Sequence, residues 1–251
     1  MDRVKEIRVK VIPSKLANDF VREHHYSGKI VPNSKLHFGC FLDNILHGVL
    51  SYGTSMAKTK IIGLVEPCLW NEVLELNRMA FDEKLPRNSE SRCIAITINL
   101  IRKKAPHIKW ILSYADGCQC GDGTIYRASG FVLTQSKVNK TMLKMPDGRI
   151  MADKTLNNSN YKIKGESAGY WKKKGAKPIE GFQLRYIYLI DKSCKITVPI
   201  IPFSKIDEMG AGMYKGVKIS LAERKRLSSN SKTSGFHSDD GGASPTQTLS
   251  K

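Results

Sequence analysis

The stretch Trp110–Phe131 constrains the fold of this chain more than any other. Trp110–Ala115 is a short apolar run rich in residues that favour strands, and Asp116 ends it. A loop with three glycines follows, and from Thr124 the apolar residues return at helical spacing. A carboxylate at the carboxyl end of a buried strand, before a flexible loop and a helix, is where open α/β folds place ligands. Because Tyr126 lies in the first turn of that helix, we expect Asp116 and Tyr126 to face one cleft.

The remaining patterns predict more strands than helices. Period-two and continuous apolar runs predict strands at 7–12, 36–42, 45–52, 73–81, 110–116, 132–138, 182–190 and 195–201. Helices are predicted after Pro13, before Pro106 and from Thr124. The segment 93–101 has the β-branched content of a strand, but its isoleucines sit at helical spacing, and we predict a helix. This order indicates a single mixed α/β layer and not a regular βαβ alternation.

The charge of the chain points to a polyanionic partner. Its 41 Lys and Arg residues against 23 Asp and Glu residues give a net charge of +18. Such an excess favours nucleic acid binding, the alternative being a solubilising surface with no specific partner. No apolar run approaches the roughly twenty residues that cross a bilayer, and the charged start is unlike a secretory signal. We therefore expect a soluble intracellular protein without a membrane partner.

Composition divides the chain into three parts. We expect one folded domain over residues 1–205, which includes a basic insert at about 140–178 that is poor in large aliphatic residues. Residues 206–227 form a basic extension, and 228–251 consist largely of Ser, Gly, Thr, Asp and Lys. Since such a composition cannot bury enough apolar surface to fold, we expect residues 228–251 to be disordered.

Six cysteines are scattered along the chain without a disulfide framework. Only one residue separates Cys118 from Cys120, whereas the paired ligands of structural zinc sites are usually separated by two to four residues. Such sites also need a second pair of ligands, which this sequence lacks. We expect no zinc.

Four side chains are candidates for chemistry. Asp116 could act as a base or hold a metal, or it could cap the following helix. Tyr126 could protonate a leaving group, the alternative being a half-buried structural tyrosine. His25 could be a base, a metal ligand or the cap of a helix end. Arg78 lies in the alternating strand 73–81, where a buried arginine needs an anion such as a donor group, a DNA phosphate or Asp116; otherwise it is an exposed edge residue.

The loop before the helix that ends near Pro106 could cradle an anion. Its residues Arg87, Asn88, Ser89, Glu90 and Ser91 precede a helix N-terminus, where free backbone amides bind negative groups. The loop has no glycine, in contrast to the phosphate-binding loops of many transferases.

Six short stretches follow one another at characteristic spacing, namely His24–Ser27, Glu75–Arg78, Leu85–Ser91, Ser113–Asp116, Gly123–Phe131 and Arg185–Asp191. In order and spacing they resemble the phage Mom-type DNA adenine modification proteins, and the element order resembles the GNAT acyltransferase fold. They cover roughly residues 10–205. The resemblance implies a GNAT-like mixed, mostly antiparallel sheet flanked by helices, with extra C-terminal strands.

The resemblance also implies an activity, namely conversion of adenine in phage DNA to an N6-carbamoylmethyl derivative that protects the DNA from host restriction. The implied catalytic residues are His25, Tyr26, Arg78, Asp116 and Tyr126. Iron binding is associated with this group, which makes His25, Tyr26, Asp116 and Tyr126 the candidate ligands. Many members carry Gly-His in the loop after the aspartate, where this chain has Cys120 and Gly121.

The resemblance implies acetyl-coenzyme A as the donor, and glycyl-tRNA is a chemical rival because a glycyl group has the same atoms as a carbamoylmethyl group. The candidate donor-binding residues are Met79, Arg87, Asn88, Ser89, Glu90 and Ser91. The partner would be double-stranded DNA in the host cytoplasm, with the target base flipped out of the duplex. Candidate DNA-binding residues are Tyr170, Trp171, Lys172, Lys173, Lys174, Arg185 and Lys205. The oligomeric state, including a homodimer, stays open.

Two other functions compete with this one. The first is an ordinary GNAT N-acetyltransferase that acts on a small amine or a protein. The second is a DNA-binding protein without catalytic activity on a degenerate transferase fold.

Overall fold

The computed structural model describes residues 3–157, 165–214, 217–220, 222, 223, 225 and 226. It forms two units, Met1–Lys218 and Ile219–Lys251, and the first holds all the elements below. The 228–251 tail that we expected to be disordered lies outside the described residues. None of the helices in the described part is long and apolar enough to cross a membrane.

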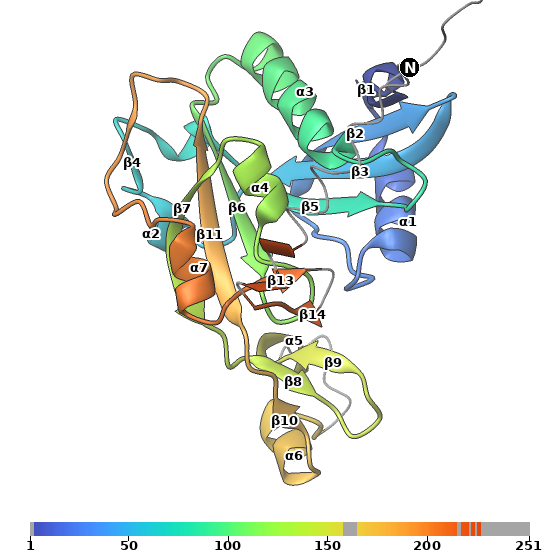
Figure 1. Cartoon of the computed structure of the whole chain (residues 1–251), viewed down its shortest axis with the longest axis vertical. Helices are drawn as coiled ribbons and strands as arrows, with labels where there is room; N and C mark the ends of the chain where they lie inside the picture. The colour runs from blue at the N-terminus through green and yellow to red at the C-terminus, as the bar shows by residue number, and fades with distance from the viewer. Residues whose placement is uncertain (1–2, 158–164, 215–216, 221, 224, 227–251) are drawn as a thin grey trace, which may run out of the picture. The chain divides into compact units, whose positions relative to one another are not determined.

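The main unit is built on a seven-stranded sheet in the order β1-β2-β3-β5-β6-β11-β7 (Figure 1). Its strands are β1 (Arg8–Val11), β2 (Ser34–Leu42), β3 (Ile45–Gly53), β5 (Val73–Phe81), β6 (Trp110–Asp116), β11 (Phe182–Leu189) and β7 (Val132–Val138). All neighbours are antiparallel except β5 and β6, which are parallel. This arrangement confirms the predicted mixed, mostly antiparallel α/β sheet.

Helices cover both faces of the sheet. The main ones are α1 (Ser14–His24), α3 (Ser89–Lys104) and α4 (Thr124–Ala128). Residues of α3 pack with Leu50, Tyr52 and Leu76 in the larger core, whereas α1 packs on the opposite face with Val49 and Ala80. The helix predicted over 93–101 is therefore confirmed as part of α3, because its isoleucines face the core at helical spacing.

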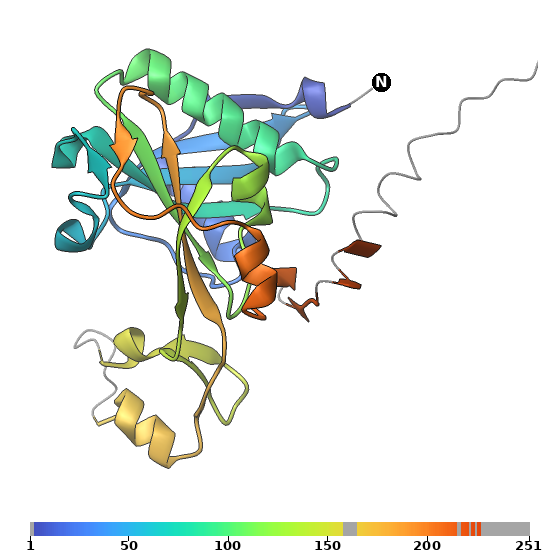
Figure 2. The same cartoon turned by 60° about the vertical axis from the view of Figure 1, so that its left-hand side comes forward.

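The basic insert folds as a small module between β7 and β11 (Figure 2). Its elements are β8 (Met142–Lys144), β9 (Ile150–Ala152), α5 (Asp153–Asn157), α6 (Ala168–Lys173) and β10 (Lys177–Pro178). Strands β10, β8 and β9 form their own three-stranded sheet. Leu143, Met145, Met151 and Leu156 bury a core of their own, against which Trp171 packs.

Short elements complete the unit. They are η1 (Arg3–Glu6), α2 (Lys58–Ile61), β4 (Val65–Glu66), η2 (Trp70–Glu72), β12 (Lys195–Ile196), α7 (Ser204–Glu208), β13 (Met213–Tyr214) and β14 (Val217–Lys218). The strand predicted over 195–201 is wrong in length, because only Lys195–Ile196 is a strand and it pairs with β4. Pro199 and Pro202 lack the backbone N–H that would extend the ladder. The unit continues beyond the expected boundary at 205, since Ile206, Ala211 and Met213 are buried.

Candidate active site

The parallel strands β5 and β6 separate partway along their length. They pair over four positions, from Val73↔Trp110 to Leu76↔Ser113. Beyond this point β5 continues to Phe81 and β6 to Asp116, with no β5–β6 pairing in the described residues. The Ser113 hydroxyl donates to the Leu76 carbonyl at 3.1 Å and closes the last pair. Beyond Leu76 and Ser113, the facing edges of β5 and β6 are therefore not paired with each other. These edges lie toward the carboxyl ends of the strands, where open sheets bind ligands.

A β-bulge at Asn77 decides which side chains line this separation. Leu76 pairs with Tyr52 and Arg78 with Ser51, so Asn77 is an extra residue without a cross-strand partner. Glu75 and Arg78 consequently lie on the α1 face, and Leu76 and Met79 point into the opposite core with α3. Arg78 therefore faces away from Leu76. Met79, a predicted donor-binding residue, packs against the core.

Arg78 connects β5 to the segment after α1. Its Nε donates to the Lys29 carbonyl and its Nη1 to the Asn77 carbonyl, each at 2.7 Å. Burial lowers the pKa of this guanidinium, and the neighbouring Tyr26, Glu75 and Tyr126 oppose that shift. Arg78 thus remains a cation beside the Glu75 carboxylate and the phenols of Tyr26 and Tyr126. Its bond to the Lys29 carbonyl fixes the loop that carries His25 and Tyr26.

Tyr26 and Asp116 meet although they are ninety residues apart. The Tyr26 hydroxyl donates to Asp116 Oδ2 at 3.5 Å, a long hydrogen bond. The Asp116 carboxylate also accepts from the Cys118 backbone N–H at 2.9 Å and from the Gln119 amide at 3.2 Å. Partial burial and the Asp116 charge raise the pKa of Tyr26, whose residue surface remains 49% exposed. Tyr26 is therefore a protonated phenol that solvent reaches.

His25 stacks on Tyr26 with ring centroids 4.3 Å apart. Its Nδ1 lies 2.8 Å from the Ser27 hydroxyl and accepts from the Ser27 backbone N–H at 3.2 Å. Because Nδ1 accepts this bond, the neutral ring carries its proton on Nε2. Burial, with a smaller effect of the Arg78 charge, lowers the pKa of His25 to about 4. His25 is thus neutral at physiological pH.

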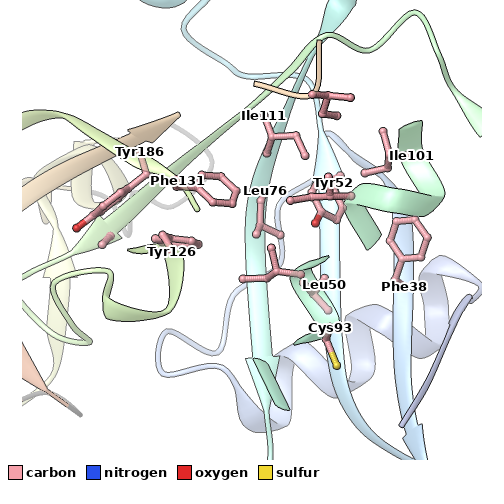
Figure 3. Packing of buried hydrophobic residues seen from close by; sticks show 14 of the residues in the cluster. Phe38, Leu50, Tyr52, Leu76, Cys93, Ile101, Ile111, Tyr126, Phe131 and Tyr186 are labelled. Carbon is pink, nitrogen blue, oxygen red and sulfur yellow. The ribbon is translucent and has the colours of Figure 1, made fainter. Parts of the chain in front are cut away.

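Tyr126 reaches the separation from the α3 side of the sheet. It packs against Phe131 and Tyr186, with ring centroids 5.5 and 5.3 Å apart (Figure 3). Burial raises the pKa of Tyr126 to about 12, and a hydrogen bond with Ser113 opposes the shift. Ser113 is the last residue of β6 that pairs with β5, so the Tyr126 hydroxyl lies where these two strands part. The structure thereby brings Tyr26, Arg78, Asp116 and Tyr126 around one end of β5 and β6.

Asp122 holds the loop between Asp116 and Tyr126 in place through an ion pair and hydrogen bonds. Its side chain is fully buried and accepts from Arg127 at 3.1 Å, from the Thr124 hydroxyl at 2.9 Å and from the Met213 backbone N–H at 3.1 Å. Gly123, with φ +81°, immediately precedes α4, and a Cβ there would overlap the Tyr186 ring. The sequence did not single out Asp122, because its partner Met213 lies ninety-one residues further on.

The four candidate ligands do not suit iron. Only His25 and Asp116 offer strong donors, since Tyr26 and Tyr126 are phenols whose raised pKa disfavours the phenolate. No group of three or more His, Cys, Asp and Glu side chains that could hold a metal occurs among the described residues. We therefore assign no reaction step to a metal.

The predicted donor loop presents backbone more than side chains. Asn88 has a left-handed backbone at φ +68° and precedes α3 without a side-chain cap. The buried Ser89 hydroxyl donates to the Pro86 carbonyl at 2.5 Å, and the Ser91 hydroxyl donates to the Asn88 carbonyl at 3.1 Å. Arg87 is exposed. The fit to a donor phosphate thus rests on Arg87 and the helix N-terminus.

The predicted DNA-binding residues lie on three separate elements. Tyr170, Trp171, Lys172 and Lys173 belong to α6 and Lys174 follows it, whereas Lys205 lies on α7 and pairs with Glu208 at 2.8 Å. Arg185 is only 8% exposed, and its Nε donates to the Thr134 hydroxyl at 3.0 Å across a bulge between β11 and β7. Three of the exposed candidate lysines therefore lie on the insert, whereas Lys205 lies on α7 and Arg185 is buried in the main sheet.

The sheet order, the parallel pair that separates and the helix after β6 define a GNAT-like fold. The structure is similar to the ribosomal-protein-S18-alanine N-acetyltransferase of Escherichia coli, with a TM-score of 0.42 and 10% identity over 74% of this chain and 94% of that chain. It is also similar to the spermidine/spermine N-acetyltransferase of Vibrio cholerae, with a TM-score of 0.44 and 8% identity over 76% and 96%.

Within this fold class the chain belongs to the Mom protein family, whose model matches residues 6–205. Methylcarbamoylase mom of Escherichia phage Mu is 39% identical to it over 128 residues. These residues make up 51% of this chain and 53% of that protein, so the match spans about half of each.

Proposed function

We propose that this protein is a phage transferase that converts adenine in DNA to N6-carbamoylmethyladenine in the host cytoplasm and so protects phage DNA from restriction. The observation that carries the proposal is the cluster of Tyr26, Arg78, Asp116 and Tyr126 where β5 and β6 separate, in a chain of the Mom protein family. The activity in the name of the phage Mu relative supports the same reaction.

The cluster offers the groups that such a transfer needs. Adenine N6 is a poor nucleophile because its lone pair is delocalised into the ring, so its proton must be removed as the new C–N bond forms. Tyr26 and Tyr126 are protonated phenols that can donate hydrogen bonds to the donor. Arg78 provides fixed positive charge where negative charge develops on the donor carbonyl.

The insert supports DNA as the substrate. Lys173 and Lys174 are exposed, and neither forms an ion pair with a described carboxylate. Tyr170 is 38% exposed and lies beside Lys174, whose ammonium is 5.9 Å from its ring centroid. We infer that the lysines hold phosphates while the target adenine is flipped toward the cluster, since its N6 is otherwise paired in the duplex.

Removing two of these lysines should reduce the salt dependence of DNA binding. For Lys173→Ala with Lys174→Ala, the slope of log K against log salt should become shallower by about 2, because each phosphate contact contributes roughly 0.9. Fluorescence anisotropy with duplex DNA at several salt concentrations measures it. The double variant Lys103→Ala with Lys104→Ala, at the exposed end of α3, is the control. Equal slopes for both double variants would contradict the assignment of the insert.

The acceptor and the donor are tested together with purified protein. We expect label to reach duplex DNA from either labelled acetyl-coenzyme A or labelled glycyl-tRNA, and not to reach spermidine or a lysine-rich peptide. Nucleoside mass spectrometry then identifies the adenine product. Transfer to the amine or the peptide with unlabelled DNA would support an ordinary N-acetyltransferase. Transfer from neither donor to any acceptor would reject both candidate donors.

A further inference from the structure

Glu75 occupies a position in the site that the sequence patterns did not assign to chemistry. It lies on β5 at the pair Glu75↔Leu112, one residue before the last β5–β6 pair. The bulge at Asn77 places its side chain on the same face as Arg78, opposite to Leu76. The carboxylate therefore lies one pair before the strands separate, and Arg78, on the same face, interacts electrostatically with both Glu75 and Tyr26.

The surroundings of Glu75 differ from those of the structural carboxylates. None of the described Lys, Arg or His nitrogens lies within 4.0 Å of its carboxylate. By contrast, Glu72 pairs with Lys109 at 2.9 Å and Asp82 with His47 at 2.7 Å. Glu75 is half-buried without such a partner, which is unusual for a group with only a structural role.

The groups that face Glu75 come from four elements around the separation. Arg78 lies on β5, Tyr114 on β6, Tyr126 on α4, and Ser55 follows β3. Burial raises the pKa of Glu75, while Ser55 and Arg78 oppose the shift. Burial raises the pKa of Tyr126 and of Tyr114, and the Glu75 charge adds to both shifts. A substrate bound between β5 and β6 would thus contact both Tyr126 and Glu75.

Asp116 is placed differently, because its oxygens already accept hydrogen bonds from three donors. These are Tyr26, the Cys118 backbone and the Gln119 amide. A carboxylate that accepts three hydrogen bonds orients its neighbours, whereas Glu75, with a hydrogen bond to Ser55, keeps oxygen lone pairs that can take a proton. Two carboxylates in such unequal surroundings commonly divide the acid–base work of a site.

We propose that Glu75 accepts the proton that adenine N6 loses, and that Asp116 acts as a positioning residue for Tyr26. This inference rests on the proposed function. The N6–H bond breaks and its proton moves to a Glu75 oxygen. The N6 electron pair forms a bond to the carbonyl carbon of a glycyl ester, the C–O bond of the ester breaks, and the departing alcohol oxygen takes its electron pair and the proton held by Glu75. The N6-glycyl adenine so formed is an isomer of N6-carbamoylmethyladenine, and it becomes that product when the glycyl amine displaces the amide nitrogen from C6.

The test compares initial rates of adenine modification across pH, with duplex DNA and a buffered host-cell extract that supplies the donor. Glu75→Gln keeps the shape of the side chain but accepts no proton, and its rate should fall by about 10²–10⁴-fold. It should also lose the decline in rate that we expect of the wild type toward acidic pH. Glu75→Asp should keep that decline at a lower rate. The exposed Glu83→Gln is the matched control and should retain the wild-type profile.

Two further measurements separate a proton acceptor from a structural group. Formate should restore activity to Glu75→Ala, because a small carboxylate can occupy the vacated space, and DNA affinity and circular dichroism should stay at wild-type values. Asp116→Asn should lower the rate while it keeps the acidic decline.

The assignment to Glu75 would be overturned if Glu75→Gln kept the wild-type rate and pH profile. It would also be overturned if Asp116→Asn, and not Glu75→Gln, lost the decline in rate toward acidic pH. Either result would leave the proposed function intact. A wild-type protein that leaves DNA unmodified in this assay would instead reject the proposed function, and the Glu75 assignment with it.

Discussion

Asp122→Ala should lower the free energy of unfolding by about 3–5 kcal/mol, the usual effect of removing one partner from a buried ion pair. The substitution leaves the Arg127 guanidinium, whose side chain is only 17% exposed, without its carboxylate. It also removes the acceptor of the Met213 N–H. Because Met213 follows α7, we expect the 204–214 segment to detach from the loop after Asp116.

Urea unfolding followed by circular dichroism measures this loss. Asp147→Ala is the matched control, since Asp147 forms an ion pair with Arg149 at 2.6 Å on an exposed turn. Surface pairs of this kind contribute at most about 1 kcal/mol. If Asp122→Ala were no more destabilising than Asp147→Ala, the described network would not hold the loop.

Arg78→Ala should lower kcat/KM for DNA modification by about 10²–10³-fold, because it removes the fixed cation from the separation of β5 and β6. Arg78→Lys should not restore the rate. A lysine has one ammonium and cannot reproduce the two hydrogen bonds that the guanidinium donates to the Lys29 and Asn77 carbonyls.

Initial rates measured below the unfolding temperature of each variant separate this effect from lost stability. The exposed Arg102, which bonds Asn99 within α3, provides the control Arg102→Ala. If Arg78→Lys kept the wild-type rate, a positive charge alone would suffice for catalysis. The two hydrogen bonds that the guanidinium donates would then not be required.

Several elements of the site could be predicted from the sequence because their signals are local. The strands 73–81, 110–116 and 132–138 were predicted with the observed bounds, since their apolar runs end at loops that break the pattern. The two residues between the predicted strands 36–42 and 45–52 form a turn, in which Asp43 and Asn44 both have positive φ. Asp116 and Tyr126 follow from the same strand–loop–helix pattern.

The other features of the site, and the fold of the insert, depend on contacts that the local sequence pattern does not contain. The bulge at Asn77 shifts the alternation of β5, so no period-two pattern could place Glu75 beside Arg78. The contact between Tyr26 and Asp116 depends on where α1 ends relative to β6. The fold of the insert could not be predicted, because its core is small and drawn from strands of two or three residues and helices of five or six.

The central claim is that the cluster at the end of β5 and β6 modifies adenine in DNA, and its most direct test is nucleoside mass spectrometry of plasmid DNA from cells that express the wild type or Asp116→Ala. We expect an adenine nucleoside that carries one additional carbamoylmethyl group in the wild-type sample, and its loss in Asp116→Ala at equal soluble protein. An unmodified adenine pool in the wild-type sample, or equal modification in both, would contradict the claim.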